Sequence, residues 1–337
     1  MKTVSLPQIH RRVPVAEGGT VLEAALRAGA PFPHGCRSGR CGSCKSELLS
    51  GEVEMLQHSP FALTAAERDS GQILACRAVP KTDVTVAWLD DEFIEKPAIR
   101  QKAQVIARDK MTHDIMRLRL ALEAPVKFRF AAGQYLNLTM ADAPMRSYSM
   151  ANRPDEAIVE LHVRHVPDGK TSTAIHRDLA VGDRVEIEGP CGSAWLRDAH
   201  DGPIIALAGG SGLAPIRSIV ETALHAGMKQ PICLYFGVRR EEDLYLVDHF
   251  EDLAKQFPNL TFIPVLSQSA ATRHRTGFVT DALAFDHHSL ADARAYVAGP
   301  PGMVDAAYAV LTERGVPAAN IHADVFFTPE EEHPKIA

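Results

Sequence analysis

Four cysteines constrain this chain more than any other feature of its sequence. Three of them stand close together and one follows far downstream: Cys36, Cys41, Cys44 and Cys76. The C-x4-C-x2-C spacing with a distant fourth cysteine is the ligand pattern of plant-type 2Fe–2S clusters. It requires a fold in which a short loop and a distant segment bring four thiolates to one metal centre. Electron transfer is therefore the first functional hypothesis.

Glycines inside the cysteine loop agree with this interpretation. Gly35, Gly39 and Gly42 let the backbone take positive φ angles and let N–H groups approach the cluster sulfides. A zinc site or two disulfides are the alternatives, but structural zinc usually takes paired C-x2-C or histidine-containing spacings, and disulfide frameworks are typical of short secreted chains. The two other cysteines, Cys191 and Cys233, lie far from the loop and are read as thiols of a reducing cytosol.

The composition is that of an ordinary globular protein with two or three domains. The chain has 337 residues, of which 46% are apolar and 23% charged, and its net charge is −6. This mild acidity, without a basic stripe, gives no reason to expect nucleic acid. No apolar run approaches the roughly 18 residues of a membrane span, and the first residues lack the apolar segment of a signal peptide. We therefore expect a cytoplasmic protein with no membrane partner.

The N-terminal segment is predicted to form the iron–sulfur domain. Thr20 and Glu23 make a capping box ahead of a short helix that Gly29 ends, and this helix leads into the cysteine loop. A strand is expected at 84–86. The acidic, proline-containing segment 90–97 is typical of a linker. These features place the first domain at residues 1–95.

The pattern of apolar residues then changes twice. Residues 99–198 contain short alternating runs separated by turn signals, which are typical of a small antiparallel barrel. Residues 203–337 contain continuous apolar runs at 204–208, 232–236, 262–266 and 295–298, as expected of buried parallel strands. Helical stretches near 214–225, 246–256 and 301–314 separate these runs and predict a doubly wound α/β domain.

A second motif, Arg146-Ser147-Tyr148-Ser149, stands at the end of a predicted barrel strand. Alone it could be an ordinary strand end. With the cysteine pattern and the domain order, the whole chain resembles the reductase components of bacterial multicomponent aromatic-ring oxygenases, such as those of phenol hydroxylase and naphthalene dioxygenase. These belong to the ferredoxin-NADP reductase superfamily. The resemblance implies an α+β ferredoxin domain of the β-grasp type, a β-barrel flavin domain and an α/β nicotinamide domain.

The resemblance also implies roles for the residues of this motif. Arg146 would pair with a flavin phosphate, Tyr148 would pack on the isoalloxazine, and Ser149 would hydrogen-bond near flavin N5. A guanidinium fork suits phosphate oxygens, and a hydroxyl can donate or accept a hydrogen bond. Further positions expected at the flavin, which relatives indicate to be FAD, are His162, Val163, Arg164, Gly169, Lys170, Thr171 and Ser172. The alternative for His162 is that it is only a strand residue.

A glycine-rich loop follows the first strand of the α/β domain and opens a helix. It differs from G-x-G-x-x-G because Pro215 stands near the third glycine position, and no acidic residue follows about 20 positions later. These differences argue against a dehydrogenase-type Rossmann domain and agree with the resembled superfamily. The expected nicotinamide-binding residues lie at the ends of successive strands: Gly209, Gly210, Gly212, Pro215, Gly237, Arg239, Gly299, Pro300 and Pro301. Many superfamily members have a cysteine where this chain has Ala298, so no thiol role is expected.

Two further expectations concern the flavin and the choice of nicotinamide. Phe326 corresponds to a terminal aromatic that lies near the flavin in the resembled family, and simple core packing is its alternative role. NADPH would require cations for the 2′-phosphate, for which Ser267, Arg273 and Arg275 are candidates, or these could be a solvated loop. We expect NADH, because most members of the resembled group use it.

The resemblance implies a route for electrons from NADH to FAD, to the 2Fe–2S cluster and then to a terminal oxygenase, either an aromatic-ring hydroxylating dioxygenase or a di-iron monooxygenase. The alternative is that the same cofactors pass electrons to a deoxysugar dehydrase instead of an oxygenase. An iron–sulfur redox sensor is the alternative from a different functional class. The cations Arg37, Arg40, Lys45 and Arg77 surround the cysteines and predict docking of an acidic partner surface, although they could also be simply solvated. A monomer is the simplest expectation for the chain itself.

Overall fold

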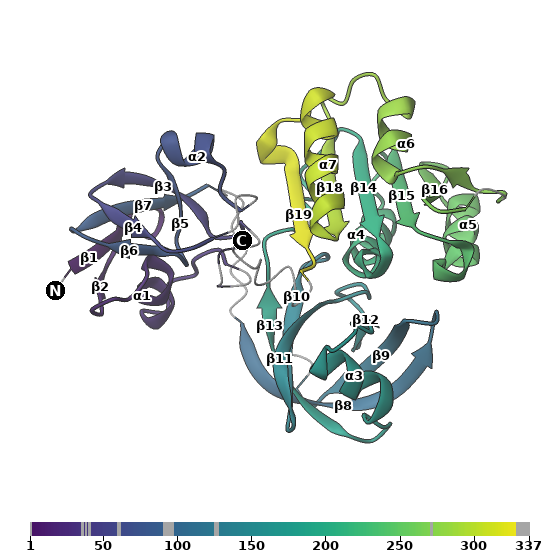
Figure 1. The fold of residues 1–337 in the computed structure, drawn as a ribbon, viewed down its shortest axis with the longest axis horizontal. Coiled ribbons are helices and arrows are strands. Elements are labelled where there is room, and N and C mark those ends of the chain that lie inside the picture. Colours follow the sequence, from purple (N-terminus) through teal and green to yellow (C-terminus); the bar gives the residue numbers. More distant parts are fainter. Residues whose placement is uncertain are drawn as a thin grey trace. The chain divides into compact units, whose positions relative to one another are not determined.

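The computed structural model describes residues 2–34, 37, 39, 42–58, 62–89, 98–124, 128–269 and 272–327. The chain divides into two compact units (Figure 1). One is formed by the N-terminal part of the chain with Cys191–Ser193, and the other by the described residues from Ala98 onward except those three.

The N-terminal unit is a mixed α/β structure around a five-stranded sheet with the order β2-β1-β7-β3-β5. Strand β1 runs parallel to β7, and the pairs β1–β2, β3–β5 and β3–β7 are antiparallel. The elements are β1 (Lys2–Leu6), η1 (Pro7–Ile9), β2 (Arg11–Val15), α1 (Val21–Arg27), β3 (Lys45–Ser50), β4 (Val53–Met55), α2 (Ala65–Asp69), β5 (Gln72–Leu74), β6 (Ala78–Pro80) and β7 (Val84–Trp88).

Helix α1 begins where the sequence predicts it. The Thr20 hydroxyl accepts a hydrogen bond from Glu23 N at 3.2 Å, and the Glu23 carboxylate accepts one from Thr20 N at 2.9 Å. This capping box satisfies two N–H groups that have no partner inside the helix. The apolar face of α1 is buried in the core of the unit with Val4, Leu6 and Phe32. The helix therefore fixes the start of the segment that leads to the cysteines.

The second unit begins with a six-stranded sheet of order β11-β10-β13-β8-β9-β12. The pairs β10–β11, β8–β9, β9–β12 and β8–β13 are antiparallel, as the alternating pattern predicts. The elements are β8 (Ile99–Lys110), β9 (Ile115–Leu122), β10 (Tyr135–Met140), β11 (Ala143–Ser149), β12 (Ile158–Arg164), α3 (Lys170–Arg177) and β13 (Arg184–Cys191).

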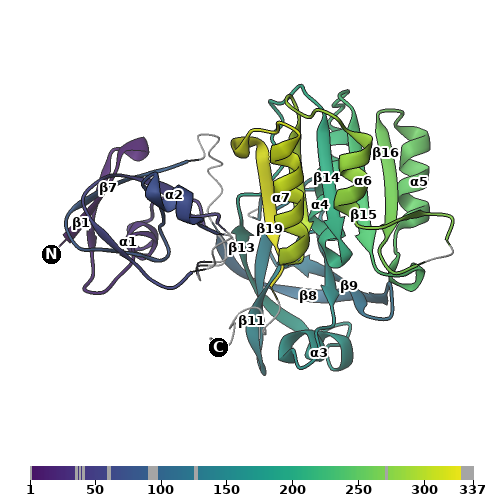
Figure 2. The same ribbon diagram turned by 45° about the horizontal axis from the view of Figure 1, so that its top comes forward.

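A parallel six-stranded sheet with the order β17-β16-β15-β14-β18-β19 follows in the same unit (Figure 2). The predicted strands and three predicted helices are confirmed, and the structure adds helix α6, which the sequence analysis did not predict. The elements are β14 (Ile204–Gly209), η3 (Gly210–Gly212), α4 (Leu213–His225), β15 (Ile232–Val238), η4 (Glu241–Asp243), α5 (Val247–Gln256), β16 (Leu260–Leu266), β17 (Arg275–Thr276), α6 (Val279–Asp286), β18 (Arg294–Gly299), α7 (Pro301–Glu313), η5 (Ala318–Asn320) and β19 (Ile321–Val325).

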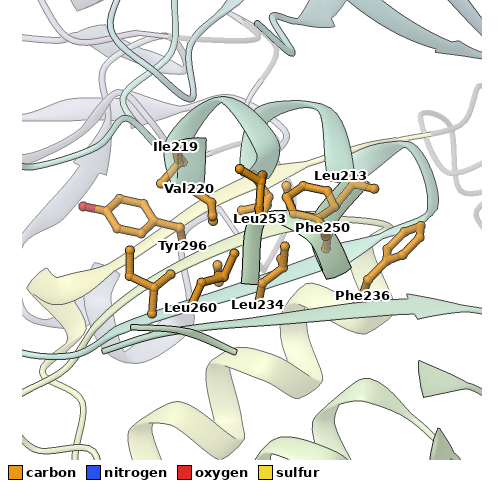
Figure 3. Close-up of a cluster of buried hydrophobic side chains, with 14 of the residues drawn as sticks. Leu213, Ile219, Val220, Leu234, Phe236, Phe250, Leu253, Leu260 and Tyr296 are labelled. Carbon is orange, nitrogen blue, oxygen red and sulfur yellow. The ribbon is translucent and has the colours of Figure 1, made fainter. Parts of the chain in front are cut away.

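Helices cover both faces of this parallel sheet, so the doubly wound prediction is confirmed. Helices α4 and α5 bury Leu213, Ile219 and Phe250 on one face with strand residues such as Leu234 (Figure 3). Helices α6 and α7 pack on the opposite face with the alternate strand residues, such as Leu207. Both faces of the strands are buried, which explains their continuous apolar runs.

The strand order reverses at β14, which lies between β15 and β18. Open α/β sheets bind ligands at the carboxyl ends of the strands beside such a switch point. The glycine loop η3 and the start of α7 lie there. None of the described helices is long and apolar enough to cross a membrane.

Candidate active site

A cleft of about 500 Å³ opens at the switch point of the parallel sheet. Of the residues expected at the nicotinamide, five line it: Gly209, Gly210, Gly237, Arg239 and Pro300. The antiparallel sheet contributes Ile115 and Arg164 to the same cleft, and the turn before β9 contributes Asp114. The cleft is therefore bounded by both sheets of the second unit.

The glycine loop owes its shape to close backbone approaches. A Cβ at Gly212 would lie 2.1 Å from the carbonyl oxygen of Ala298, and one at Gly209 would lie 2.6 Å from Met303 Sδ. Only glycine fits against the backbone of strand β18 at position 212, whereas a side chain at position 209 would require Met303 of helix α7 to move. Gly210 has φ of +55°. Pro215 falls in the first turn of α4, where no intrahelical partner for its nitrogen is lost.

The loop after β18 prepares the other wall of the cleft. Pro300 is the N-cap of α7 and Pro301 its first residue, as suits a helix start. Ala298 is fully buried in strand β18. Phe326 follows strand β19, and its backbone N–H donates to the carbonyl oxygen of Gly299 at 2.9 Å. The terminal aromatic is thus anchored next to the loop that opens α7.

Ser149 connects the end of strand β11 to strand β19. It is 7% exposed, and its hydroxyl donates a 2.7 Å hydrogen bond to Asp324 Oδ2. The sequence analysis named Ser149 but did not identify Asp324 as a site residue. A carboxylate near the end of the last predicted strand was the available signal. The bond places the end of strand β11 against β19, the edge strand of the parallel sheet.

The other three residues of the Arg146–Ser149 motif have different surroundings along β11. The Ser147 hydroxyl donates to Asn137 Oδ1 at 2.8 Å, and Tyr148 packs against the core of the antiparallel sheet. Burial raises the pKa of Tyr148 and outweighs the lowering by Arg146, so the phenol stays protonated. Arg146 is exposed, and its guanidinium donates to the Met145 carbonyl at 3.0 Å. It retains donors for an anionic group.

Helix α3 carries the residues expected near the flavin pyrophosphate. Gly169 is its N-cap, and a Cβ there would lie 2.8 Å from Ser172 Oγ. The Thr171 hydroxyl donates to the Pro144 carbonyl at 2.6 Å, and Ser172 Oγ accepts from Val166 N at 3.1 Å. These bonds hold the start of α3, with Lys170, beside the chain that enters β11.

The three consecutive residues at the end of β12 have different surroundings. The His162 ring is fully buried and hydrogen-bonds Glu160, so its side chain faces the interior rather than the cleft. Val163 is buried in the sheet core. Arg164 lines the cleft, and its Nε donates to Asp114 Oδ2 at 2.8 Å. Burial would raise the pKa of Asp114, but the Arg164 charge and hydrogen bond hold it below its usual value.

A second cation–carboxylate pair lies on the other wall of the cleft. Arg239 Nε is 3.7 Å from Asp243 Oδ2, and both residues line the cleft. His113 lies between the two pairs, 3.9 Å from Asp114 and 3.8 Å from Asp243. Sequence reasoning missed both carboxylates, because they are far apart in the chain and belong to no motif.

Two candidate cations for a 2′-phosphate are engaged by carboxylates. Arg275 Nη1 lies 2.6 Å from Asp286 Oδ2, and Arg273 Nη2 lies 3.6 Å from Glu251 Oε1. Ser267 alone of these three candidates lines the cleft.

Two of the predicted cluster ligands, Cys44 and Cys76, lie within the described residues, and Cys36 and Cys41 lie outside them. Cys44 is 3% and Cys76 5% exposed. The Ala75 N–H donates to the Cys44 carbonyl at 3.0 Å, which holds the two segments side by side. Gly39 lies against Arg77, since a Cβ on it would be 2.7 Å from Arg77 Cγ. The cysteine loop thus reaches the segment of the distant fourth cysteine, as a shared cluster requires.

The cations around the cysteines are not equivalent. Lys45 Nζ is 2.6 Å from Glu67 Oε1, so its charge is compensated. Arg77 Nε donates to the Gln57 carbonyl at 2.8 Å. Arg37 is exposed, with its guanidinium 3.2 Å from His34 Nε2, and Arg40 lies outside the described residues.

The fold and the cleft define a nucleotide-dependent oxidoreductase with an iron–sulfur domain. Three family models match the chain in sequence order: a 2Fe-2S iron-sulfur cluster binding domain at 6–81, an oxidoreductase FAD-binding domain at 102–195 and an oxidoreductase NAD-binding domain at 206–308. The three expected domains and the expected cofactor classes are confirmed.

The chain belongs to the family of ferredoxin–NAD(P)+ reductase components of multicomponent oxygenase systems. It is 40% identical over 315 residues to the reductase component of the naphthalene 1,2-dioxygenase/salicylate 5-hydroxylase systems of Ralstonia sp., covering 93% of this chain and 95% of the relative. It is 37% identical to the reductase component DmpP of phenol 2-monooxygenase from Pseudomonas sp. strain CF600, covering 94% and 92%. The family resemblance inferred from sequence is thus confirmed.

A solved structure agrees with the whole fold. The crystal structure of the Amycolatopsis cytochrome P450 reductase GcoB superposes with a TM-score of 0.80 at 37% identity and covers 97% of this chain and 99% of that one.

Proposed function

We propose that this chain oxidises NADH and delivers the electrons, one at a time, to a terminal oxygenase. Bound FAD would accept hydride from the nicotinamide and pass single electrons to the 2Fe–2S cluster, which resolves the mismatch between a two-electron donor and a one-electron acceptor. The observation that carries this proposal is the 2.7 Å bond from Ser149 to Asp324, since it joins the flavin-domain strand to the nicotinamide sheet beside the cleft.

The chain's own residues bind and orient in this proposal. The backbone of the glycine loop and the guanidiniums of Arg164 and Arg239 would hold the dinucleotide in the cleft. Arg146, Tyr148, Ser149, Phe326 and the start of α3 would hold the flavin. Cys36, Cys41, Cys44 and Cys76 would ligate the cluster. The proposed domains span residues 1–95, 99–198 and 203–337, the first a β-grasp ferredoxin and the second a barrel.

The preference for NADH rests on the charges near the cleft. A 2′-phosphate requires a cation in the cleft, whereas neither Arg273 nor Arg275 lines it. Asp243 adds a negative charge to the cleft wall. Like charges disfavour a phosphate dianion there. We infer that NADH binds more tightly than NADPH.

The oxygenase partner is inferred from the relatives, whose names assign them to naphthalene dioxygenase and phenol monooxygenase systems. The partner would dock an acidic surface near Arg37 and Arg77, and electron transfer should then weaken as ionic strength rises. The protein would act as a cytoplasmic monomer.

An anaerobic equilibrium titration tests the assignment. We expect NADH to bleach both the flavin and the iron–sulfur absorbance, and NADPH to do so only at higher concentration. Absence of bound flavin, or a cluster that stays oxidised in excess NADH, would contradict the proposal.

A further inference from the structure

A buried chain of hydrogen bonds runs from strand β12 to the glycine loop of the cleft. Glu160 Oε1 accepts from His162 Nε2 at 3.1 Å, and His162 Nδ1 lies 3.3 Å from the hydroxyl of Tyr245. The Tyr245 hydroxyl in turn donates to the carbonyl oxygen of Gly210 at 3.4 Å. Tyr245 lies in the segment between η4 and α5 and is 5% exposed. None of these contacts is explained by binding of the flavin.

The protonation states of Glu160 and His162 decide which atoms donate and which accept in this chain of hydrogen bonds. Burial would raise the pKa of Glu160, but the His162 hydrogen bond and the Arg217 charge hold it well below its usual value, so the carboxylate only accepts. Burial lowers the pKa of His162, so its ring is neutral. Its one proton then lies on Nε2, facing Glu160, and Nδ1 is an acceptor. The single hydrogen of the Tyr245 hydroxyl is therefore shared between two acceptors, His162 Nδ1 at 3.3 Å and the Gly210 carbonyl oxygen at 3.4 Å.

Glu160, where the chain of hydrogen bonds starts, is fixed by ion pairs to the neighbouring strand β9 and to helix α4. Glu160 is 5% exposed and pairs with Arg119 of β9 at 2.9 Å. It also pairs with Arg217 of α4, the helix that the glycine loop opens. Arg217 Nε pairs with Glu221 Oε1 at 2.7 Å. A buried carboxylate with this many partners has little freedom to move.

The Tyr245 ring is held equally firmly. It packs edge-on against His162 at a centroid distance of 5.3 Å and against Phe236 at 5.5 Å. The next residue, Leu246, has φ of +57°, a left-handed conformation that is strained for any residue with a side chain. The fold maintains this strained position and thereby delivers the phenol to the loop.

The chain of hydrogen bonds ends at the carbonyl oxygen of Gly210. This oxygen accepts from the Leu213 N–H as well as from Tyr245, so two hydrogen bonds hold this peptide in one orientation. Gly210 itself has no side chain that would restrict its peptide, and it adopts φ of +55°. In a trans peptide the N–H of the next residue points opposite to the carbonyl. Rotation of this peptide would bring an oxygen toward an anionic ligand in place of N–H groups.

We propose that Tyr245 is a positioning residue for the nicotinamide dinucleotide. Its hydroxyl holds the Gly210 carbonyl turned inward, so that the loop offers N–H groups to the phosphates of the ligand. This inference rests on the proposed function of the cleft as the NADH site.

The test compares two buried tyrosines. Tyr245→Phe removes the hydroxyl and keeps the ring, and we expect it to weaken NAD+ binding to the oxidised holoprotein about five-fold, the value of one hydrogen bond. The KM for NADH should rise by the same factor, with kcat for ferricyanide reduction unchanged. Tyr235→Phe is the matched control, because its hydroxyl bonds Asp286 and His287 at 2.9 and 3.0 Å, away from the cleft. Both variants should lose thermal stability, but the control should keep the NAD+ affinity.

Equal NAD+ affinity in Tyr245→Phe and the unaltered protein would overturn the inference and leave the proposed function intact. Failure of the unaltered protein to bind NAD+ would overturn both. If Tyr245→Phe does not fold, hydrogen exchange of the unaltered protein decides the matter. We expect the amides of residues 210–212 to exchange more slowly when NAD+ is added, and unchanged exchange there would overturn the inference.

Discussion

Ser149 and Asp324 are joined by a 2.7 Å hydrogen bond although they are 175 residues apart in the chain. The hydroxyl comes from the antiparallel sheet and the carboxylate from the parallel sheet. Because Ser149 donates its hydrogen to Asp324, its oxygen remains able to accept a hydrogen bond from a group in the site. The pair therefore fixes the orientation of the hydroxyl that the family resemblance predicts to lie near flavin N5.

Removing this hydroxyl should slow the reaction more than it weakens binding. We expect Ser149→Ala to lower the rate of flavin reduction by NADH about ten-fold, the effect of one lost hydrogen bond of 1–1.5 kcal/mol, with NAD+ affinity unchanged. Ser218→Ala is the control, since that buried hydroxyl donates to the Asn152 carbonyl at 2.6 Å and has no place in the site. Stopped-flow absorbance under anaerobic conditions measures the rate. An equal loss in both variants would mean that Ser149 acts only through folding.

The positive charge of Arg239 should stabilise the bound nucleotide, whereas that of Arg240 should not. Arg239→Gln is expected to raise the KM for NADH about ten-fold, because a charge-assisted hydrogen bond to phosphate is lost. Arg240→Gln is the matched control, since Arg240 pairs with Glu242 at 3.6 Å and does not line the cleft. The difference between the variants should shrink at high salt, as screening requires. Identical KM values would remove Arg239 from the site.

Substitution of a cluster cysteine should prevent assembly of the cluster but leave reduction of the flavin intact. Cys44→Ser and Cys76→Ser each remove a proposed ligand, so we expect loss of the iron–sulfur absorbance and of cytochrome c reduction. NADH should still reduce the flavin. Cys233→Ser should keep the cluster, because burial raises the pKa of that thiol and keeps it protonated. Iron content and visible spectra check these outcomes, and a full cluster in Cys44→Ser would contradict the ligand assignment.

His322 predicts how stability depends on pH. Burial, assisted by the charges of Arg197 and Arg294, lowers the pKa of His322 to about 3. An unfolded histidine titrates near pH 6.5, so below that pH the unfolded chain binds a proton that the folded chain does not. Stability is therefore lost as pH falls from 6.5, by about 1.4 kcal/mol per pH unit from this residue. Denaturant unfolding of His322→Gln should show a shallower decline between pH 6.5 and 4.5, and parallel declines would refute the assignment.

The sequence predicted those features that short-range patterns encode. The cysteine spacing, the R-x-Y-S strand and the glycine loop each combine residue types with a local backbone shape. Helix α6 was missed because it has only eight residues and no clear amphipathic stripe. Asp324 and Tyr245 were missed because their roles depend on contacts with residues 175 and 35 positions away. His162 was assigned to the flavin, but its ring faces Glu160 and Tyr245, so only its backbone remains available for that role.

The most direct test of the account is a single-turnover reaction of the oxidised protein with NADH, without oxygen, in which flavin and iron–sulfur absorbance are resolved in time. The account predicts that the flavin bleaches first and that the cluster is reduced afterwards at a rate independent of NADH concentration. Reduction of the cluster before the flavin, or in protein from which the flavin has been removed, would contradict the proposed order of electron transfer.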